Sequence, residues 1–312
     1  MTWLGASRSL LLTGLADVWD AARERARDGG EGFGLFLMVV SAACFAAMAA
    51  FAKKLLPDAP IQAVVFSRGV MMSAIFVAAS RWQGAPVVGK RPGVLLLRGL
   101  LGYAALSCYF FSVQHLPLGD AVLLQYSHPV FVAAVAPLFL GERTAGSQWL
   151  LIVAALAGVA LVVRPAGEVR PEALVGVLGS MLSGLAYIAV RKLSRTEHPM
   201  TILLWFPLAT VPFSLVGTLS AGRAAIPKNG REVAGHLLVT AAALVGQIAL
   251  THGLARVGAA RATAVTLTGP VFGLALGFFL FGTVPTAASL AGTVVVLSAL
   301  AMLGRSSSRR KT

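Results

Sequence analysis

The chain has 312 residues, of which 57% are hydrophobic and only 12% are charged, and its mean hydropathy is +0.81. This composition excludes a soluble globular protein, which needs far more charge to cover a surface of that size. The formal net charge of +14 would suit a nucleic-acid-binding protein, but the placement of the basic residues indicates a membrane protein instead.

Residues 1–30 precede the first apolar run and predict an amphipathic helix on the cytoplasmic membrane surface. Apolar residues recur there at helical spacing, opposite charged ones: Leu11, Leu15, Val18, Trp19 and Ala22. A secretory signal peptide is the alternative, because Arg8 precedes a short apolar run.

Ten apolar runs follow, each about 20 residues long and therefore sufficient to cross a bilayer as a helix. They cover roughly 32–52, 60–80, 93–114, 119–140, 145–163, 172–193, 199–220, 233–255, 259–281 and 286–304. Short Pro- and Gly-rich connections leave no room for a soluble domain. We therefore predict an all-α membrane protein with ten transmembrane helices.

The basic residues are distributed unequally between the two sides that ten spans define. Of the 26 Lys and Arg residues, seventeen lie on the side of the N-terminus, seven on the other side, and Arg68 and Arg98 inside spans. The positive-inside rule then places both termini, including a basic tail at 305–312, in the cytoplasm. The expected location of the protein is the inner membrane. The charge is accounted for by topology, so no nucleic-acid partner is expected.

A repeated stretch divides the chain into two halves. Residues 119–143, GDAVLLQYSHPVFVAAVAPLFLGER, reappear at 261–285 as RATAVTLTGPVFGLALGFFLFGTVP. We predict five spans in 31–164, a linker at 165–171 and five spans in 172–304. An odd number of spans per half inverts the second half, and carriers built in this way hold their substrate where the halves meet.

Two further features of the repeated stretch concern packing. Gly269, Gly273 and Gly277 recur every fourth residue, which predicts close helix packing. Pro129 and Pro270 occupy equivalent positions in mid-span and predict kinks, or a simple fit of helix shape, in the fourth and ninth helices.

The chain resembles the EamA branch of the drug/metabolite transporter superfamily over about 31–304. The resemblance rests on LRGLLGYAALSCYFFSVQHLPLGDA, on the PVF-containing span that ends FLGER, and on GLARVGAARATAVTLTGPVFG. It implies two inverted five-helix repeats around a central cavity, and transport of small metabolites. Glu142 fits the family pattern after the fourth span, whereas Thr283 stands where the second repeat would usually have a Glu.

The acidic residues argue against several mechanisms. All twelve Asp and Glu residues fall in loops, termini or helix ends, so a buried acidic relay is not expected. His128 and His252 are then the candidates for coupling to protons. Walker, dinucleotide, CxxC and HExxH motifs are absent from the sequence, so we expect no cofactor, no metal, no ATP-driven pumping and no enzymatic activity.

Arg68 and Arg98 are the candidate anchors for a substrate. A guanidinium in hydrocarbon costs at least ~2.5 kcal/mol, so each should face protein or water. Arg98 has an alternative, because its side chain could extend to the cytoplasmic interface. Without an acidic counter-ion in mid-membrane, a carboxylate or phosphate of the substrate is a suitable partner, which favours an anionic or zwitterionic compound.

Other polar and aromatic residues of the spans complete the predicted substrate-binding set. They are Tyr103, Tyr109, Gln125, Tyr126, His128, Tyr187, Gln247 and His252. As a group they suit a cavity for an amphiphilic organic molecule, and individually they also suit hydrogen bonding between helices. Gln114 and Trp205 are expected at membrane interfaces instead.

The sequence therefore predicts a secondary transporter that moves a small organic metabolite by alternating access. Two alternatives remain: a flippase for a lipid-linked substrate on the same scaffold, and a membrane-embedded transferase. The expected partners are the lipid bilayer and a small-molecule substrate, and a homodimer stays open.

Overall fold

The computed structural model describes residues 31–308, apart from 58, 133, 135–145, 164–169, 194–195, 221–226, 255–264 and 266–267. This part of the chain forms ten α-helices, which confirms the predicted fold class. They are α2 (Glu31–Leu55), α3 (Ile61–Trp82), α4 (Pro92–His115), α5 (Leu118–Tyr126), α7 (Gly146–Val163), α8 (Pro171–Leu193), α9 (Pro199–Ser220), α10 (Gly230–Leu254), α12 (Thr268–Phe281) and α13 (Ala287–Ser308). The predicted N-terminal amphipathic helix, Glu142 and the last four residues of the tail lie outside the described residues.

Most of these helices have the length and composition of membrane spans. Six are long and apolar enough to cross a bilayer (α2, α3, α4, α8, α9 and α10), and α7, α12 and α13 contain shorter apolar helices. Large apolar side chains point outward, such as Leu150, which is 71% exposed, and Phe279, which is 80% exposed. A surface of this kind is stable where lipid is the solvent, so the chain is a multi-pass membrane protein.

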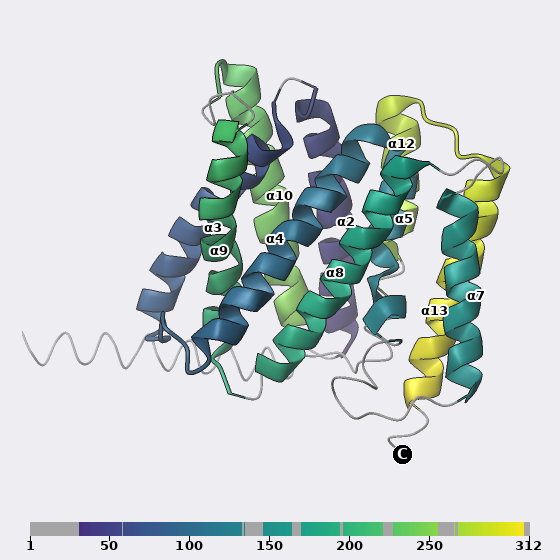
Figure 1. Cartoon of the computed structure of the whole chain (residues 1–312), viewed down its shortest axis with the longest axis horizontal. Helices are drawn as coiled ribbons and strands as arrows, with labels where there is room; N and C mark the ends of the chain where they lie inside the picture. The colour runs from purple at the N-terminus through teal and green to yellow at the C-terminus, as the bar shows by residue number, and fades with distance from the viewer. Residues whose placement is uncertain are drawn as a thin grey trace, which may run out of the picture.

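The larger helix contacts are symmetric between the two halves, so that each has an equivalent when the halves are interchanged. Helix α2 packs on α10, and its equivalent α8 packs on α4. The pairs α3–α9, α5–α12 and α7–α13 are each made of equivalent helices from the two halves. In Figure 1, α3 and α9 lie at one end of the long axis and α7 and α13 at the other, with the remaining helices between them. The halves are thus interleaved rather than separate, and most large contacts join one half to the other.

The two equivalent helix crossings use the same residue types. A Cβ placed on Gly179 of α8 would lie 2.8 Å from the Cβ of Cys108 on α4. A Cβ placed on Gly246 of α10 would lie 3.2 Å from the Cβ of Cys44 on α2. Both cysteines are free thiols and act here as small apolar groups that let the helix axes approach.

The glycine ridge of α12 packs on α5. A Cβ on Gly269 would overlap the ring of Tyr126, and one on Gly273 would lie 2.7 Å from Val122. Gly277 faces the backbone of Gly119. Pro270 lies close after residues 266–267, which are outside the described part of the chain, so the kink predicted there stays a prediction.

Candidate functional site

Arg68 on α3 and Arg98 on α4 converge on one aromatic ring, that of Phe206 on α9. The guanidinium carbon of Arg68 lies 5.5 Å from the ring centroid, and that of Arg98 lies 4.6 Å from it. Contacts of this kind stabilise a cation by about 0.5–2 kcal/mol. Two residues that the sequence singled out separately therefore belong to one group, which we call the arginine cluster (Arg68, Arg98 and Phe206).

The arginine cluster holds buried hydrogen-bond donors without acceptors. The Nε atom of Arg68 and the Nε and Nη1 atoms of Arg98 are buried and unpartnered, and Arg68 as a whole is only 4% exposed. Among the described residues, no carboxylate forms an ion pair with either arginine. Arg98 thus has its guanidinium against Phe206, with two of its nitrogens shielded from water, rather than fully extended to an interface. Buried charges without partners are unfavourable, so these donors suit a ligand that brings acceptor oxygens.

Tyr103 is engaged in a hydrogen-bonded chain between α3 and α4. Its hydroxyl donates to Oε1 of Gln62 at 3.1 Å, and Nε2 of Gln62 donates to the Ser107 hydroxyl at 3.3 Å. The Tyr103 ring also packs 5.8 Å from that of Phe213 on α9. These contacts join the three helices that carry the arginine cluster, so Tyr103 serves helix packing as well as the wall of the site.

His128 follows the interruption of the fourth span. Helix α5 ends at Tyr126, Ser127 forms a turn, and Pro129 has no N–H to donate to the carbonyl of Gln125. Nδ1 of His128 lies 2.9 Å from that carbonyl oxygen and donates to it, which leaves Nε2 as the acceptor nitrogen of the neutral ring. The histidine therefore satisfies a backbone group that the proline frees.

Tyr187 of α8 connects His128 with the arginine cluster. The rings of His128 and Tyr187 are stacked with centroids 4.6 Å apart, and Tyr187 has an electrostatic interaction with Arg98. Nε2 of Gln125 donates to the Ser183 hydroxyl on the same helix at 3.0 Å. Tyr187 as a whole is 45% exposed, unlike the buried guanidinium of Arg68.

The other predicted residues occupy different places. Tyr109 is 6% exposed and packs against Phe110, and Tyr126 packs against the α12 ridge, so both belong to the core. Gln247 and His252 lie on α10, which packs against α2 and α3. The structure thus brings Arg68, Arg98, Tyr103, Gln125, His128 and Tyr187 into one neighbourhood around α4 and leaves Gln247 and His252 on another helix.

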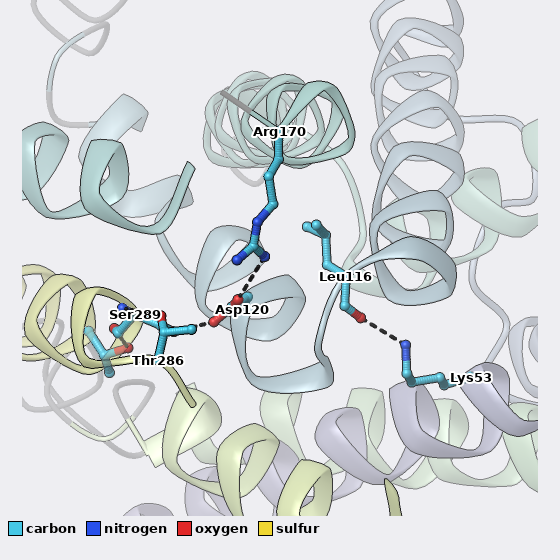
Figure 2. Close-up of polar contacts among 7 residues, drawn as sticks. Lys53, Leu116, Asp120, Arg170, Thr286 and Ser289 are labelled. Carbon is cyan, nitrogen blue, oxygen red and sulfur yellow. Dashed lines mark hydrogen bonds and ion pairs between the residues drawn. The ribbon is translucent and has the colours of Figure 1, made fainter. Parts of the chain in front are cut away.

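Asp120 forms a buried polar group at one end of the bundle. Its Oδ1 accepts a hydrogen bond from the Ser289 hydroxyl on α13, and its Oδ2 lies 3.5 Å from Nη1 of Arg170, just before α8. Figure 2 shows the carboxylate pointing between these two partners. We call Asp120, Arg170 and Ser289 the Asp120 cluster, which ties α5 of the first half to the second half.

Lys53 stabilises the same end within the first half. Its Nζ donates to the carbonyl oxygens of Val113 at 2.7 Å and Leu116 at 2.8 Å, as Figure 2 shows for Leu116. These carbonyls belong to the last turn of α4 and to the residue that follows the helix, where carbonyls have no helical donor, so a cation there is favourable. Lys53 therefore fixes α2 against the turn between α4 and α5.

Glu197 forms the corresponding contact at the opposite end of the bundle. Its carboxylate accepts the backbone N–H of Lys90 at 2.9 Å and that of Arg91 at 2.7 Å, although the side chain is only 8% exposed. Lys90 and Arg91 precede α4, whereas Glu197 lies between α8 and α9. We call these three residues the Glu197 cluster, which also joins one half to the other.

Two further bonds hold the same connection. The Thr201 hydroxyl donates to the carbonyl of Pro86 at 2.6 Å, and Nε1 of Trp205 donates to that of Val87 at 3.0 Å. The loop between α3 and α4 is therefore bound to the start of α9. The indole N–H of Trp205 thus has a partner within the protein, and the interfacial place expected for it stays a prediction.

The comparisons with known proteins agree with the division of the chain into two equivalent halves. The model of the EamA-like transporter family matches residues 32–164 and again residues 170–305. The chain belongs to the EamA-like transporter family. It is 30% identical over 275 residues to the pseudopaline exporter of Pseudomonas aeruginosa, which covers 87% of this chain and 96% of that protein. It is 27% identical over 217 residues to a riboflavin transporter of Rhizobium johnstonii, which covers 69% of this chain and 71% of that one.

A solved crystal structure has the same fold. It superposes with a TM-score of 0.62 at 19% identity and covers 89% of this chain and 99% of its own. This likeness agrees with the all-helical fold. The family match and the named relatives confirm the resemblance that the repeated motifs indicated and identify the chain as a membrane transporter of small molecules.

Several residues of the site were not found from the sequence. Phe206 lies in an apolar helix where an aromatic ring has no distinguishing pattern. Gln62 and Ser183 are polar residues within spans, and the same signal that selected Gln125 could have selected them. The partners of Asp120 and Glu197 are far away in sequence, so no local pattern identifies them.

Proposed function

We propose that this protein is a secondary carrier for a small anionic or zwitterionic organic metabolite and that it has no enzymatic activity of its own. The observation that supports this substrate class is the arginine cluster, with its buried donors and no carboxylate partner among the described residues. A substrate carboxylate or phosphate would supply the missing acceptors. The names of the two relatives, an exporter and a transporter of particular compounds, agree with a carrier.

We propose alternating access as the mechanism, by movement of one half against the other. Its support is that contacts joining the halves occur at both ends, in the Asp120 cluster and the Glu197 cluster. Opening one end would break one cluster and leave the other formed. The interleaved pairs α3–α9 and α5–α12 would then act as the surfaces on which the halves pivot.

Transport by purified protein in proteoliposomes tests the proposal. Radiolabelled anionic, zwitterionic and cationic metabolites are offered to vesicles with wild type, with Arg68→Ala or with Arg98→Ala. Arg81→Ala, an exposed arginine at the end of α3, is the matched control. We expect uptake of an anion or zwitterion that both cluster variants lose and the control retains. Transport confined to cations would contradict the proposed substrate class, and movement of a fluorescent lipid instead would support a flippase.

The proposed orientation places the Glu197 end, with both termini, in the cytoplasm of the inner membrane. Single cysteines in a variant without Cys44 and Cys108 test this orientation. We expect a membrane-impermeant thiol reagent to label Lys228→Cys, before α10, in intact cells, and to label Lys90→Cys only after lysis. The reverse pattern would contradict the proposed orientation.

A further inference from the structure

We propose that Arg68 and Arg98 form a single site for two negative charges carried close together, as in a dicarboxylate or a phosphate monoester. The inference rests on the proposed function and narrows it, because a monocarboxylate or a zwitterion would satisfy only one of the two cations. Phe206 forms one wall of the site.

The geometry of the arginine cluster makes one ligand sufficient for both cations. The two guanidinium carbons lie 5.5 Å and 4.6 Å from the same ring, although they come from two different helices. Helix α9, which carries that ring, packs against both α3 and α4. A ligand seated beside Phe206 is therefore within reach of both arginines.

The charge of the arginine cluster requires two negative charges for neutrality. Arg68 and Arg98 interact electrostatically with each other, and this interaction between like charges is unfavourable. Neither has a carboxylate partner among the described residues. The ring of Phe206 attracts the cations but carries no net charge, so it cannot neutralise them. A dianion removes the repulsion, whereas a monoanion leaves one cation uncompensated.

The unpartnered donors are divided between the two arginines. Arg68 offers Nε, and Arg98 offers Nε and Nη1, all three buried. A single carboxylate has two oxygens, whereas two carboxylates or one phosphate offer more acceptors in the directions of two separate side chains. The donor set thus agrees with the charge.

Tyr187 indicates where the rest of the substrate would lie. Its phenol group interacts electrostatically with Arg98, its ring stacks on His128 with centroids 4.6 Å apart, and the residue is 45% exposed. An organic group attached to the two acidic groups can therefore pack on this ring while the acidic groups contact the arginines.

Three compounds of the same shape and different charge test the inference. Succinate carries two negative charges at neutral pH, its monoamide succinamate carries one, and succinamide carries none. Purified full-length protein in detergent, at constant ionic strength and without phosphate, is titrated with each, and Tm is followed because a ligand of the folded state raises it. We expect succinate to bind at least about tenfold more tightly than succinamate, since each charged hydrogen bond contributes about ten- to hundredfold.

The variants decide whether the arginine cluster is responsible. In Arg68→Ala or Arg98→Ala we expect succinate and succinamate to bind equally, whereas Arg81→Ala should keep the preference of wild type. Elution volume in gel filtration and Tm without ligand show whether each variant is folded. If Arg98→Ala does not fold, Arg98→Lys takes its place, because it retains the charge.

Two results would overturn the inference. An equal shift in the Tm of wild type with all three compounds, or no shift with any of them, excludes a site for two charges. Tighter binding of succinamate that depends on Arg68 excludes it too, but leaves the proposed carrier of anions and zwitterions intact. Transport of cations alone in the vesicle assay would reject the proposed substrate class itself, so the two failures are distinguishable.

Discussion

Ser289 donates a hydrogen bond to Asp120 across 169 residues of sequence, from α13 in the second half to α5 in the first. Asp120 is only 4% exposed, and its other oxygen faces Arg170. A buried carboxylate depends on such partners, so this single bond couples the two halves at one end of the bundle.

Ser289→Ala is expected to destabilise the protein by about 1–3 kcal/mol, because it leaves one oxygen of a buried carboxylate without its donor. Tm of the purified protein in detergent measures the effect. Ser220→Ala, at the exposed end of α9, is the matched control and should leave Tm unchanged. Equal Tm values for the two variants would show that the bond contributes nothing.

Glu197→Ala is expected to release the loop before α4. The backbone N–H groups of Lys90 and Arg91 lose a charged acceptor. A hydrogen bond to a charged group contributes about 1.5–3 kcal/mol, so the exchange of these N–H groups with solvent deuterium should accelerate by at least about tenfold. Hydrogen–deuterium exchange of a peptide covering 83–91 measures this directly.

Glu232→Ala is the control for that experiment. Glu232 accepts the N–H of Lys228 at 3.0 Å within its own turn before α10, so its loss should leave the exchange of 83–91 as in wild type. Unchanged exchange in Glu197→Ala would mean that Thr201 and Trp205 hold the loop without the carboxylate.

Gly269→Ala is expected to lower the free energy of unfolding by about 1–3 kcal/mol, because the added Cβ would overlap the ring of Tyr126 and force α12 away from α5. Gly93→Ala adds the same atom to α4 where no other atom lies within 4 Å. Its Tm should be equal to or slightly above that of wild type. A similar Tm for both variants would show that α12 can move away from α5 without a loss of stability.

His128→Phe separates the two contacts of this histidine. The variant retains an aromatic ring to stack on Tyr187 but loses the Nδ1–H that donates to the Gln125 carbonyl. We expect a loss of about 1–3 kcal/mol in stability and a lower initial rate of uptake in proteoliposomes.

Tyr187→Phe is the counterpart of that change, since it keeps the stacked ring and removes only a hydroxyl. It should retain the Tm of wild type. If His128→Phe were as stable as Tyr187→Phe, the carbonyl freed by Pro129 would not need the histidine.

The sequence was sufficient for the architecture because the physical signals for membrane helices are local. Uninterrupted apolar runs gave the spans, and the repeated stretch around Pro129 gave the two halves. The match between 119–143 and 261–285 also placed α5 and α12 as equivalents, which the structure packs against each other.

The site was accessible from the sequence only in part. Arg68 and Arg98 could be selected because a guanidinium inside an apolar run is costly, but nothing local says that both reach Phe206. Glu197 reads as an ordinary loop carboxylate, because its partners are backbone groups more than 100 residues away. Such contacts depend on how helices cross, which hydropathy does not encode.

The two-fold pairing of the helices also has a consequence for the resting state of the carrier. If the two halves were chemically identical, the inward-open and outward-open conformations would have equal free energy and equal populations. In the mechanism proposed above, one end of this chain is closed by a carboxylate, a serine and an arginine, and the other by a carboxylate and two backbone N–H groups. In the proposed mechanism, the difference in strength between these two closures would bias the equilibrium, and a change of 1.4 kcal/mol in either one would shift it about tenfold. A single substitution at either end would therefore reset which side of the membrane the empty carrier faces.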